Sequence, residues 1–265
     1  MKIFISADIE GITTTTTWDE TKPSHDSYGP HAKQMTEEVL ACIEGAKKAG
    51  AETVVVKDAH GSMMNIDPLR MPSGVTLIRH YSGHPYIMVE GVDKTFDAAM
   101  FIGYHSSASR IGNPLSHTNY LSLNYLKING VIASEFLLYS YACALEGVPT
   151  VFLSGDKMLC DDFKDLHPSL VTCPVKDGLG AMTMNYSTLD TLQKIKVLSE
   201  KSLKQDLKSA LVKLPDHFNV EFNFKEHMHT EKVSHFPGIK RQSDTVITFE
   251  SDSFYEVLRT VRWIL

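Results

Sequence analysis

Short apolar runs that each stop at a polar cluster recur through the first 160 residues of the chain. Residues 2–8 have the continuous apolar character of a buried strand, residues 31–48 carry apolar side chains at helical spacing, and residues 52–57 form a second, valine-rich run. A strand, a helix and a strand in this order favour a parallel pair joined by a right-handed crossover. Such units build open sheets with helices on both faces. The sequence therefore predicts a three-layer α/β/α fold with a mostly parallel sheet.

The later segments continue this pattern and then change it. The pattern predicts strands at 75–78, 96–103 and 150–153, a hairpin over 119–132 that turns at Asn129-Gly130, and a helix over 134–146. Beyond residue 185 it predicts a long helix over 188–213, strands over 219–224 and 245–250, and a closing helix over 254–264. We therefore expect an α/β domain over residues 1–185, and a smaller α+β portion over 186–265 that packs on it and takes part in oligomerisation.

The composition is that of a folded protein without a polyanionic partner. The chain has 265 residues, of which 43% are hydrophobic and 22% charged, and its formal net charge is −6. This charge gives no sign of a nucleic-acid partner. No apolar run reaches the roughly 18 residues that a membrane span needs, and the first residues enter a strand without the pattern of a signal peptide. We expect a cytoplasmic protein with no membrane partner.

Polar side chains stand where three of the predicted strands end. Asp8 and Glu10 follow the first strand, Asp58 and His60 follow the second, and His105 follows the strand over 96–103. Residues two apart in a strand point to the same face, and carboxylates beside an apolar strand are costly to bury unless a cation meets them. Because ligands of open α/β sheets bind at the carboxyl ends of the strands, these side chains should gather at one rim.

Two further residues can join that rim. Glu135 follows Ser134, a candidate helix N-cap, where the helix dipole alone would also favour a carboxylate. His117 lies just before the predicted hairpin and is either a general base or a loop histidine. Mixed Asp, Glu and His ligation suits zinc, with Mn²⁺ and Co²⁺ as competitors. Three carboxylates and two histidines exceed one tetrahedral site, which favours two ions bridged by a carboxylate and by a water or hydroxide that attacks the substrate.

Taken in order, several segments resemble the M55 peptidase family of D-aminopeptidases. The pieces include Ser-Ala-Asp-Ile-Glu-Gly-Ile at 6–12, Lys-Asp-Ala-His at 57–60 and Gly-Tyr-His-Ser-Ser-Ala-Ser at 103–109. Shorter matches are found at 88–91, 116–117, 133–135, 154–156 and 236–238. Each piece alone is weak, but the ordered set is specific and covers essentially the whole chain.

The resemblance implies a two-zinc aminopeptidase. It implies that Asp8 bridges the metals and that the ligands are Asp8, Glu10, His60, His105 and Glu135. It gives His117 the catalytic role, described in the family as that of a nucleophile. A general base or transition-state stabiliser is physically easier, because two metal ions already supply an attacking hydroxide. Asp58 would either orient His60 by accepting the hydrogen of its other nitrogen, as acceptors commonly do for metal-bound histidines, or be a plain turn residue.

The resemblance also implies the substrate and the assembly. The expected substrate is a short peptide or amino acid amide with an N-terminal D-residue, and the expected assembly is a ring-shaped homo-oligomer, a decamer, whose active sites face an inner channel. One segment departs from the family pattern: the threonine run over 13–17 with Trp18, which could line the substrate pocket.

Two other functions fit the same residues. A metal-dependent phosphoesterase would use a similar two-metal core but would usually add basic residues for the phosphate charge, and here the basic neighbours are Lys57 and Arg110. A non-catalytic peptide-binding protein would hold its metals as closed structural sites, whereas a catalytic site keeps one position open for water.

Overall fold

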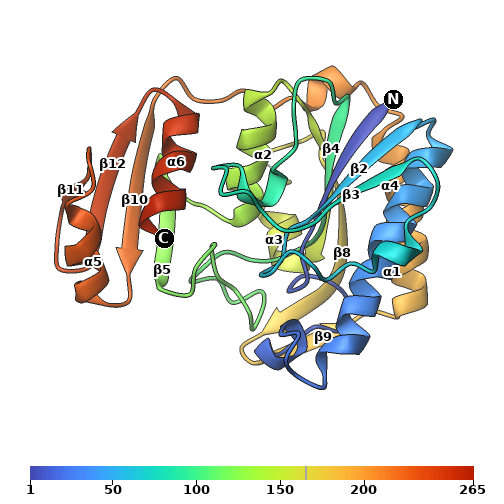
Figure 1. Cartoon of the computed structure of the whole chain (residues 1–265), viewed down its shortest axis with the longest axis horizontal. Coiled ribbons are helices and arrows are strands. Elements are labelled where there is room, and N and C mark those ends of the chain that lie inside the picture. Colours follow the sequence, from blue (N-terminus) through green and yellow to red (C-terminus); the bar gives the residue numbers. More distant parts are fainter. Residues whose placement is uncertain (165) are drawn as a thin grey trace.

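The computed structural model describes residues 1–164 and 166–265, and within them the chain forms two sheets (Figure 1). The larger sheet has seven strands in the order β3-β2-β1-β4-β7-β8-β9. All neighbours in this sheet pair in parallel except β8 and β9. Its strands are β1 (Lys2–Ala7), β2 (Thr53–Asp58), β3 (Val75–Ile78), β4 (Ala98–Tyr104), β7 (Thr150–Asp156), β8 (Val171–Leu179) and β9 (Met182–Asn185).

Helices cover both faces of the larger sheet. Helices α1 (Tyr28–Lys48) and α4 (Thr188–Ser202) pack on each other against one face, and α2 (Glu135–Leu145) covers the other. The alternation of side chains along β1 explains the two layers, because Ile3 and Ile5 join the buried cluster beneath α1 whereas Phe4 joins the cluster on the opposite side. The predicted three-layer α/β/α fold is confirmed.

The smaller sheet is antiparallel and lies beyond α2 (Figure 1). Its order is β11-β12-β10-β5-β6. Helix α6 contacts both this sheet and α2, so it ties the two sheets together. The elements of this part are β5 (Leu123–Ile128), β6 (Val131–Ile132), β10 (Phe218–Phe224), α5 (His227–Ser234), β11 (Lys240–Arg241), β12 (Val246–Ser251) and α6 (Phe254–Ile264).

Segments cross between the two sheets in both directions. Strands β5 and β6 precede residue 185 in the sequence but belong to the smaller sheet, and α4 follows residue 185 but packs on α1. The domain boundary near residue 185 stays a prediction. In space, each of the two sheets with its helices contains elements from both sides of that residue.

One long element was predicted wrongly. The helix expected over 188–213 ends at Ser202, and a separate 3-10 turn covers Leu207–Ala210. The carboxylate of Asp206 accepts a hydrogen bond from the backbone N–H of Lys208, so it caps the later turn instead of continuing the helix. Strands β8 and β9 and helices α3 (Lys157–Asp162) and α5 were not predicted at all.

The remaining short elements are 3-10 turns at Trp18–Thr21, Pro68–Arg70 and Ile87–Val89. Within the described parts of the chain, none of the helices is both long enough and apolar enough to cross a bilayer.

Candidate metal centre

Strands β1, β2 and β4 lie side by side and end at the same rim of the larger sheet. Ala7 pairs with Asp58 of β2 on one side and with Ile102 of β4 on the other. Because the three strands are parallel, the residues that follow them leave the sheet at one place. In the structure, the polar clusters therefore converge at one rim, as predicted.

Each of the five predicted ligands lies within 3.5 Å of at least one other. Nδ1 of His60 is 2.9 Å from Oε2 of Glu10 and 3.4 Å from Oδ1 of Asp8. Nε2 of His105 is 3.5 Å from Oδ2 of Asp8 and 3.2 Å from Oε2 of Glu135. Asp8 therefore stands between the two histidines, and Glu135 joins from the first turn of α2, where Ser134 is the N-cap that the sequence predicted.

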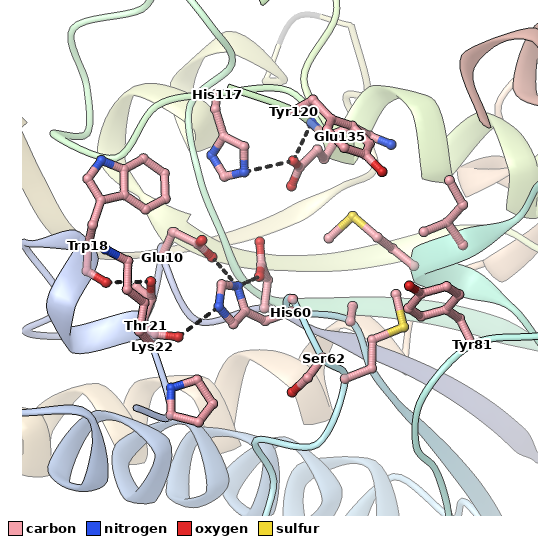
Figure 2. A pocket seen from close by; sticks show the side chains of 18 of the residues that line it. Glu10, Trp18, Thr21, Lys22, His60, Ser62, Tyr81, His117, Tyr120 and Glu135 are labelled. Carbon is pink, nitrogen blue, oxygen red and sulfur yellow. Dashed lines mark hydrogen bonds and ion pairs between the residues drawn. The ribbon is translucent and has the colours of Figure 1, made fainter. Parts of the chain in front are cut away.

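His117 joins the same cluster from the loop before β5. Its Nε2 is 3.4 Å from Oε1 of Glu135, and its ring stacks on that of His105 with centroids 4.4 Å apart. The ring of Trp18 also contacts the His117 ring, in an edge-to-face arrangement with the two centroids 5.4 Å apart. Figure 2 shows His117 and Glu135 on one side of the cavity, facing Glu10 and His60 on the other.

Each of the three imidazoles has one nitrogen bound to a backbone carbonyl. The pairs are His60 Nε2 with Thr21 O (3.0 Å), His105 Nδ1 with Ser106 O (2.9 Å) and His117 Nδ1 with Leu115 O (2.9 Å). A carbonyl only accepts, so the nitrogen that faces it carries the hydrogen. The other nitrogen of each ring points toward the carboxylates and can offer a lone pair to a metal ion, the arrangement found around metal-bound histidines.

Burial and mutual charge shift the pKa values of these groups strongly. Burial, reinforced by the neighbouring Glu10, raises the pKa of Asp8 to about 8. Burial alone would lower the pKa of His105, but the charges of Glu135 and Asp8 outweigh it and raise that pKa to about 10. Burial would raise the pKa of Glu10, but His60 holds it well below its ordinary value. The metal-free cluster therefore keeps protons that a metal ion would displace.

The donor set fits a divalent metal ion. Among the residues that the structure describes, the buried atoms Oε2 of Glu10 and Nε2 of His105 make no hydrogen bond of good geometry, although charged partners lie close. One potential ligand atom each from Asp8, Glu10 and His105 lies within 4.8 Å of the others, and the same holds for His105, His117 and Glu135. Buried groups of this kind are normally satisfied, and carboxylates with imidazoles suit zinc. The second group would also allow His117 to be a ligand.

The backbone of Glu10 is held by residues that the sequence did not single out. Nδ2 of Asn113 donates to the carbonyl of Glu10 at 2.9 Å, and the buried ammonium of Lys176 donates to the same carbonyl and to that of Thr15. A lone lysine inside the apolar run of β8 is a signal that could have drawn attention to Lys176, since lysine is almost never fully buried without a partner.

The loop that carries His105 is fixed from β7. The carboxylate of Asp156 accepts hydrogen bonds from the backbone N–H and the hydroxyl of Ser106, both at 2.6 Å. It also caps α3 through the N–H of Leu159. The position of His105 thus depends on a residue of the motif at 154–156.

Of the two roles predicted for Asp58, the one behind His60 is wrong. Its carboxylate accepts from the backbone N–H groups of Asn65 and Ile66, at 2.5 and 2.8 Å, and from Nδ2 of Asn65 at 2.8 Å. Nδ2 of Asn65 also donates to the backbone carbonyl of His60. Asp58 therefore shapes the loop around His60, and the acceptor behind the imidazole is the carbonyl of Thr21, which no sequence pattern marks.

The threonine run over 13–17 is tied to distant elements and leads into the cavity wall. The N–H of Thr13 donates to Glu38 of α1, and the N–H of Thr14 donates to Asn185 of β9. The run ends in a capping box that starts the turn Trp18–Thr21. Of the segment that the sequence suggested for the pocket wall, Trp18 lines the cavity and the threonines at 13–17 do not; Thr21, in the turn that follows, lines it as well.

A cavity of about 480 Å³ opens beside the cluster (Figure 2). Its volume is in the range that small ligands occupy, about 300–1,000 Å³. The two basic residues considered for phosphate binding lie elsewhere: the ammonium of Lys57 donates to Met63 and to the carbonyl of His80, and Arg110 pairs with Asp162. Neither lines the cavity.

Comparisons with known proteins all match this chain to D-aminopeptidases. The sequence model of the M55 peptidase family, described as D-aminopeptidase, matches residues 1–263. A D-aminopeptidase of Bacillus subtilis (strain 168) is 28% identical over an alignment of 270 residues that covers 98% of this chain and 95% of that protein. A solved structure, the Zn-dependent D-aminopeptidase DppA from Bacillus subtilis, called a self-compartmentalizing protease, is similar with a TM-score of 0.93 and 25% identity over 100% of this chain and 96% of that one.

Proposed function

Because the chain belongs to the M55 peptidase family, we propose that it is a zinc-dependent aminopeptidase that removes N-terminal D-amino acids from short peptides or amides. The observation that carries this proposal is the meeting of five buried or half-buried ligands at one sheet rim beside the cavity, namely Asp8, Glu10, His60, His105 and Glu135. The zinc dependence and the D-residue preference come from the relatives in Bacillus subtilis, whose names state them.

We infer two zinc ions per subunit, shared through Asp8. Two overlapping groups of ligand atoms support this count, and Asp8 lies between His60 and His105, the histidines of opposite sides of the cluster. When bound, the ions would polarise the scissile carbonyl and activate a water molecule for attack.

His117 is the residue placed to move a proton. Burial lowers its pKa below the ordinary value for histidine, so the ring is neutral near pH 7. Its Nδ1 hydrogen is directed to the carbonyl of Leu115, which leaves Nε2 free to accept a proton and to pass it to the leaving amine. Trp18 covers this ring and helps to exclude water from it.

We also propose that the chain assembles into a homo-oligomer, a ring-shaped decamer, whose cavities face an interior channel. The support is the relative called a self-compartmentalizing protease, whose structure matches the whole of this chain. Light scattering on the purified protein tests this, and a monomeric mass would contradict it. A cytoplasmic location stays a prediction.

The direct test of function combines metal analysis with a small substrate panel. We expect hydrolysis of D-alanine amide and D-alanyl-D-alanine, weaker hydrolysis of the L-forms, loss of activity after chelation and recovery with zinc. Hydrolysis of p-nitrophenyl phosphate without peptide hydrolysis would favour the phosphoesterase. Binding of D-peptides without turnover by the metal-loaded protein would favour the peptide-binding alternative.

A further inference from the structure

Helix α6, the last element of the chain, contributes a cation to the cavity. Arg262 lines the same cavity as Glu10, His60 and Glu135, although it lies more than 100 residues beyond them in the sequence. It reaches this position because α6 packs on α2, the helix that begins at Glu135.

The guanidinium of Arg262 has no carboxylate partner among the residues that the structure describes. It forms no hydrogen bond or ion pair within them, and it lies over two aromatic rings, with centroids 5.8 Å away for Tyr81 and 6.0 Å away for Trp263. Four other arginines are paired with acids: Arg70 with Glu37, Arg110 with Asp162, Arg241 with Glu231 and Arg259 with Glu256. Aromatic contact holds the plane of a guanidinium while its N–H groups stay available for an anion.

Two hydrogen bonds lead from Tyr139, which feels the charge of Arg262, to the metal rim. Burial raises the pKa of the Tyr139 phenol, and the positive charge of Arg262 is near enough to oppose that rise. The hydroxyl of Tyr139 accepts a hydrogen bond from Asn119 at 2.7 Å, and the N–H of Asn119 donates to Glu135 at 2.7 Å. Arg262 therefore lines the same cavity as Glu135, and Tyr139 and Asn119 link its surroundings to that carboxylate.

The other cation on the cavity wall is less available. The ammonium of Lys22 lies 3.4 Å from Oδ1 of Asp19, so a carboxylate already shares its charge. At the other end of the cavity, the charges of Asp8, Glu10 and Glu135 are taken up by the proposed zinc ions. A peptide whose scissile bond lies at the metal ligands would thus find an unpaired guanidinium available for its C-terminal carboxylate.

We propose that Arg262 binds the C-terminal carboxylate of the substrate, so that the enzyme prefers peptides with a free C-terminus, of about two or three residues, over the corresponding amides. This inference rests on the proposed aminopeptidase function. A planar guanidinium can hold a carboxylate by two parallel hydrogen bonds. The cavity volume of about 480 Å³ agrees with a substrate of this size.

The first experiment compares D-alanyl-D-alanine with D-alanyl-D-alanine amide. In the wild type we expect a lower KM for the free acid. In Arg262→Met we expect KM for the free acid to rise about 10- to 100-fold, the range for losing a hydrogen-bonded charge partner, with kcat changed little and the amide affected far less. Arg262→Lys should restore part of the difference.

Arg259→Met is the matched control. Arg259 lies one turn earlier on α6, is paired with Glu256 and does not line the cavity. It should leave the ratio of the two KM values at the wild-type level. Equal effects of Arg262→Met on the acid and the amide, or no effect on either, would overturn the proposal.

A binding measurement separates this proposal from the function on which it rests. The chain has two tryptophans, Trp18 on the cavity wall and Trp263 beside Arg262, so ligand binding can be followed by fluorescence. The probes are an aminomethylene isostere of D-alanyl-D-alanine, which cannot be hydrolysed, and its C-terminal amide. Tighter binding of the acid that Arg262→Met abolishes would support the carboxylate site even if no peptide were turned over. Equal affinities in the wild type would contradict it even if D-peptides were hydrolysed.

Discussion

The imidazole rings of His105 and His117 stack almost parallel, with centroids 4.4 Å apart and an angle of 13° between their planes. Nε2 of each ring faces a different oxygen of Glu135, at 3.2 and 3.4 Å. One carboxylate therefore joins a predicted metal ligand to the predicted catalytic residue, and the roles of the two rings can be separated by experiment.

Replacement of His117 by alanine should abolish most of the activity and leave the metal in place. We expect kcat to fall about 10²- to 10⁴-fold, the usual contribution of a general acid or base. The zinc should stay, because the five predicted ligands are unchanged. The measurements are kcat and zinc content. His235→Ala is the control, since that side chain is 76% exposed. A wild-type kcat would contradict the catalytic role, and loss of zinc would make His117 a ligand instead.

Replacement of Asp8 by alanine should remove the metal. Its two oxygens face His60 and His105, so no other side chain can take over the shared position. We expect the purified variant to hold less than one equivalent of zinc and to be inactive. Asp244→Ala, at a side chain that is 92% exposed, should keep the wild-type metal content. Two equivalents of zinc in Asp8→Ala would rule out bridging by Asp8.

Zinc affinity should rise with pH. In the metal-free cluster Asp8 has a pKa of about 8 and His105 one of about 10, so both hold protons at pH 7. Ligands bind zinc in their deprotonated forms, and protons therefore compete with the metal as the pH falls. Calorimetry of zinc binding in buffers of different ionisation enthalpy should show proton release at pH 7 and less of it at higher pH. An affinity that is constant between pH 6 and 9 would disagree with these pKa values.

Gly11→Ala should displace the backbone at the rim, because the added methyl group would clash with the main chain of β4. A Cβ atom at this position would lie 1.8 Å from the carbonyl oxygen of Tyr104 and 2.5 Å from that of Gly103. We expect the free energy of unfolding to fall by about 1–3 kcal/mol, as for overpacked sites, and zinc occupancy to fall because Glu10 moves away from His105.

Gly29→Ala is the control for this substitution, because nothing lies within 4 Å of the added Cβ in α1. Alanine there should leave stability unchanged or raise it by up to about 1 kcal/mol. Equal stability and zinc content in both variants would show that the close approach at Gly11 does not hold the rim together.

The sequence was enough to predict the rim and most of the side chains that meet there. Asp8, His60 and His105 each follow an apolar strand directly, and parallel neighbouring strands must end on the same side of a sheet. Local signals also placed Glu135, since Ser134 is a recognisable N-cap. In these cases a few neighbouring residues decide where the side chain lies, so its position can be predicted from the local sequence.

Other parts of the site depend on contacts between distant elements. Lys176 reaches the carbonyl of Glu10 from β8, the carbonyl of Thr21 meets His60, and Arg262 arrives on α6. The correction at Asp58 has a different origin, because its partners Asn65 and Ile66 lie in the loop that follows it and were decided by how that loop closes. The chain by itself determined which strands end in the polar side chains of the rim, because strand order and alternation are local properties. Only the tertiary structure decided what stands behind His60 and across the cavity, because those contacts join elements that no short-range pattern connects.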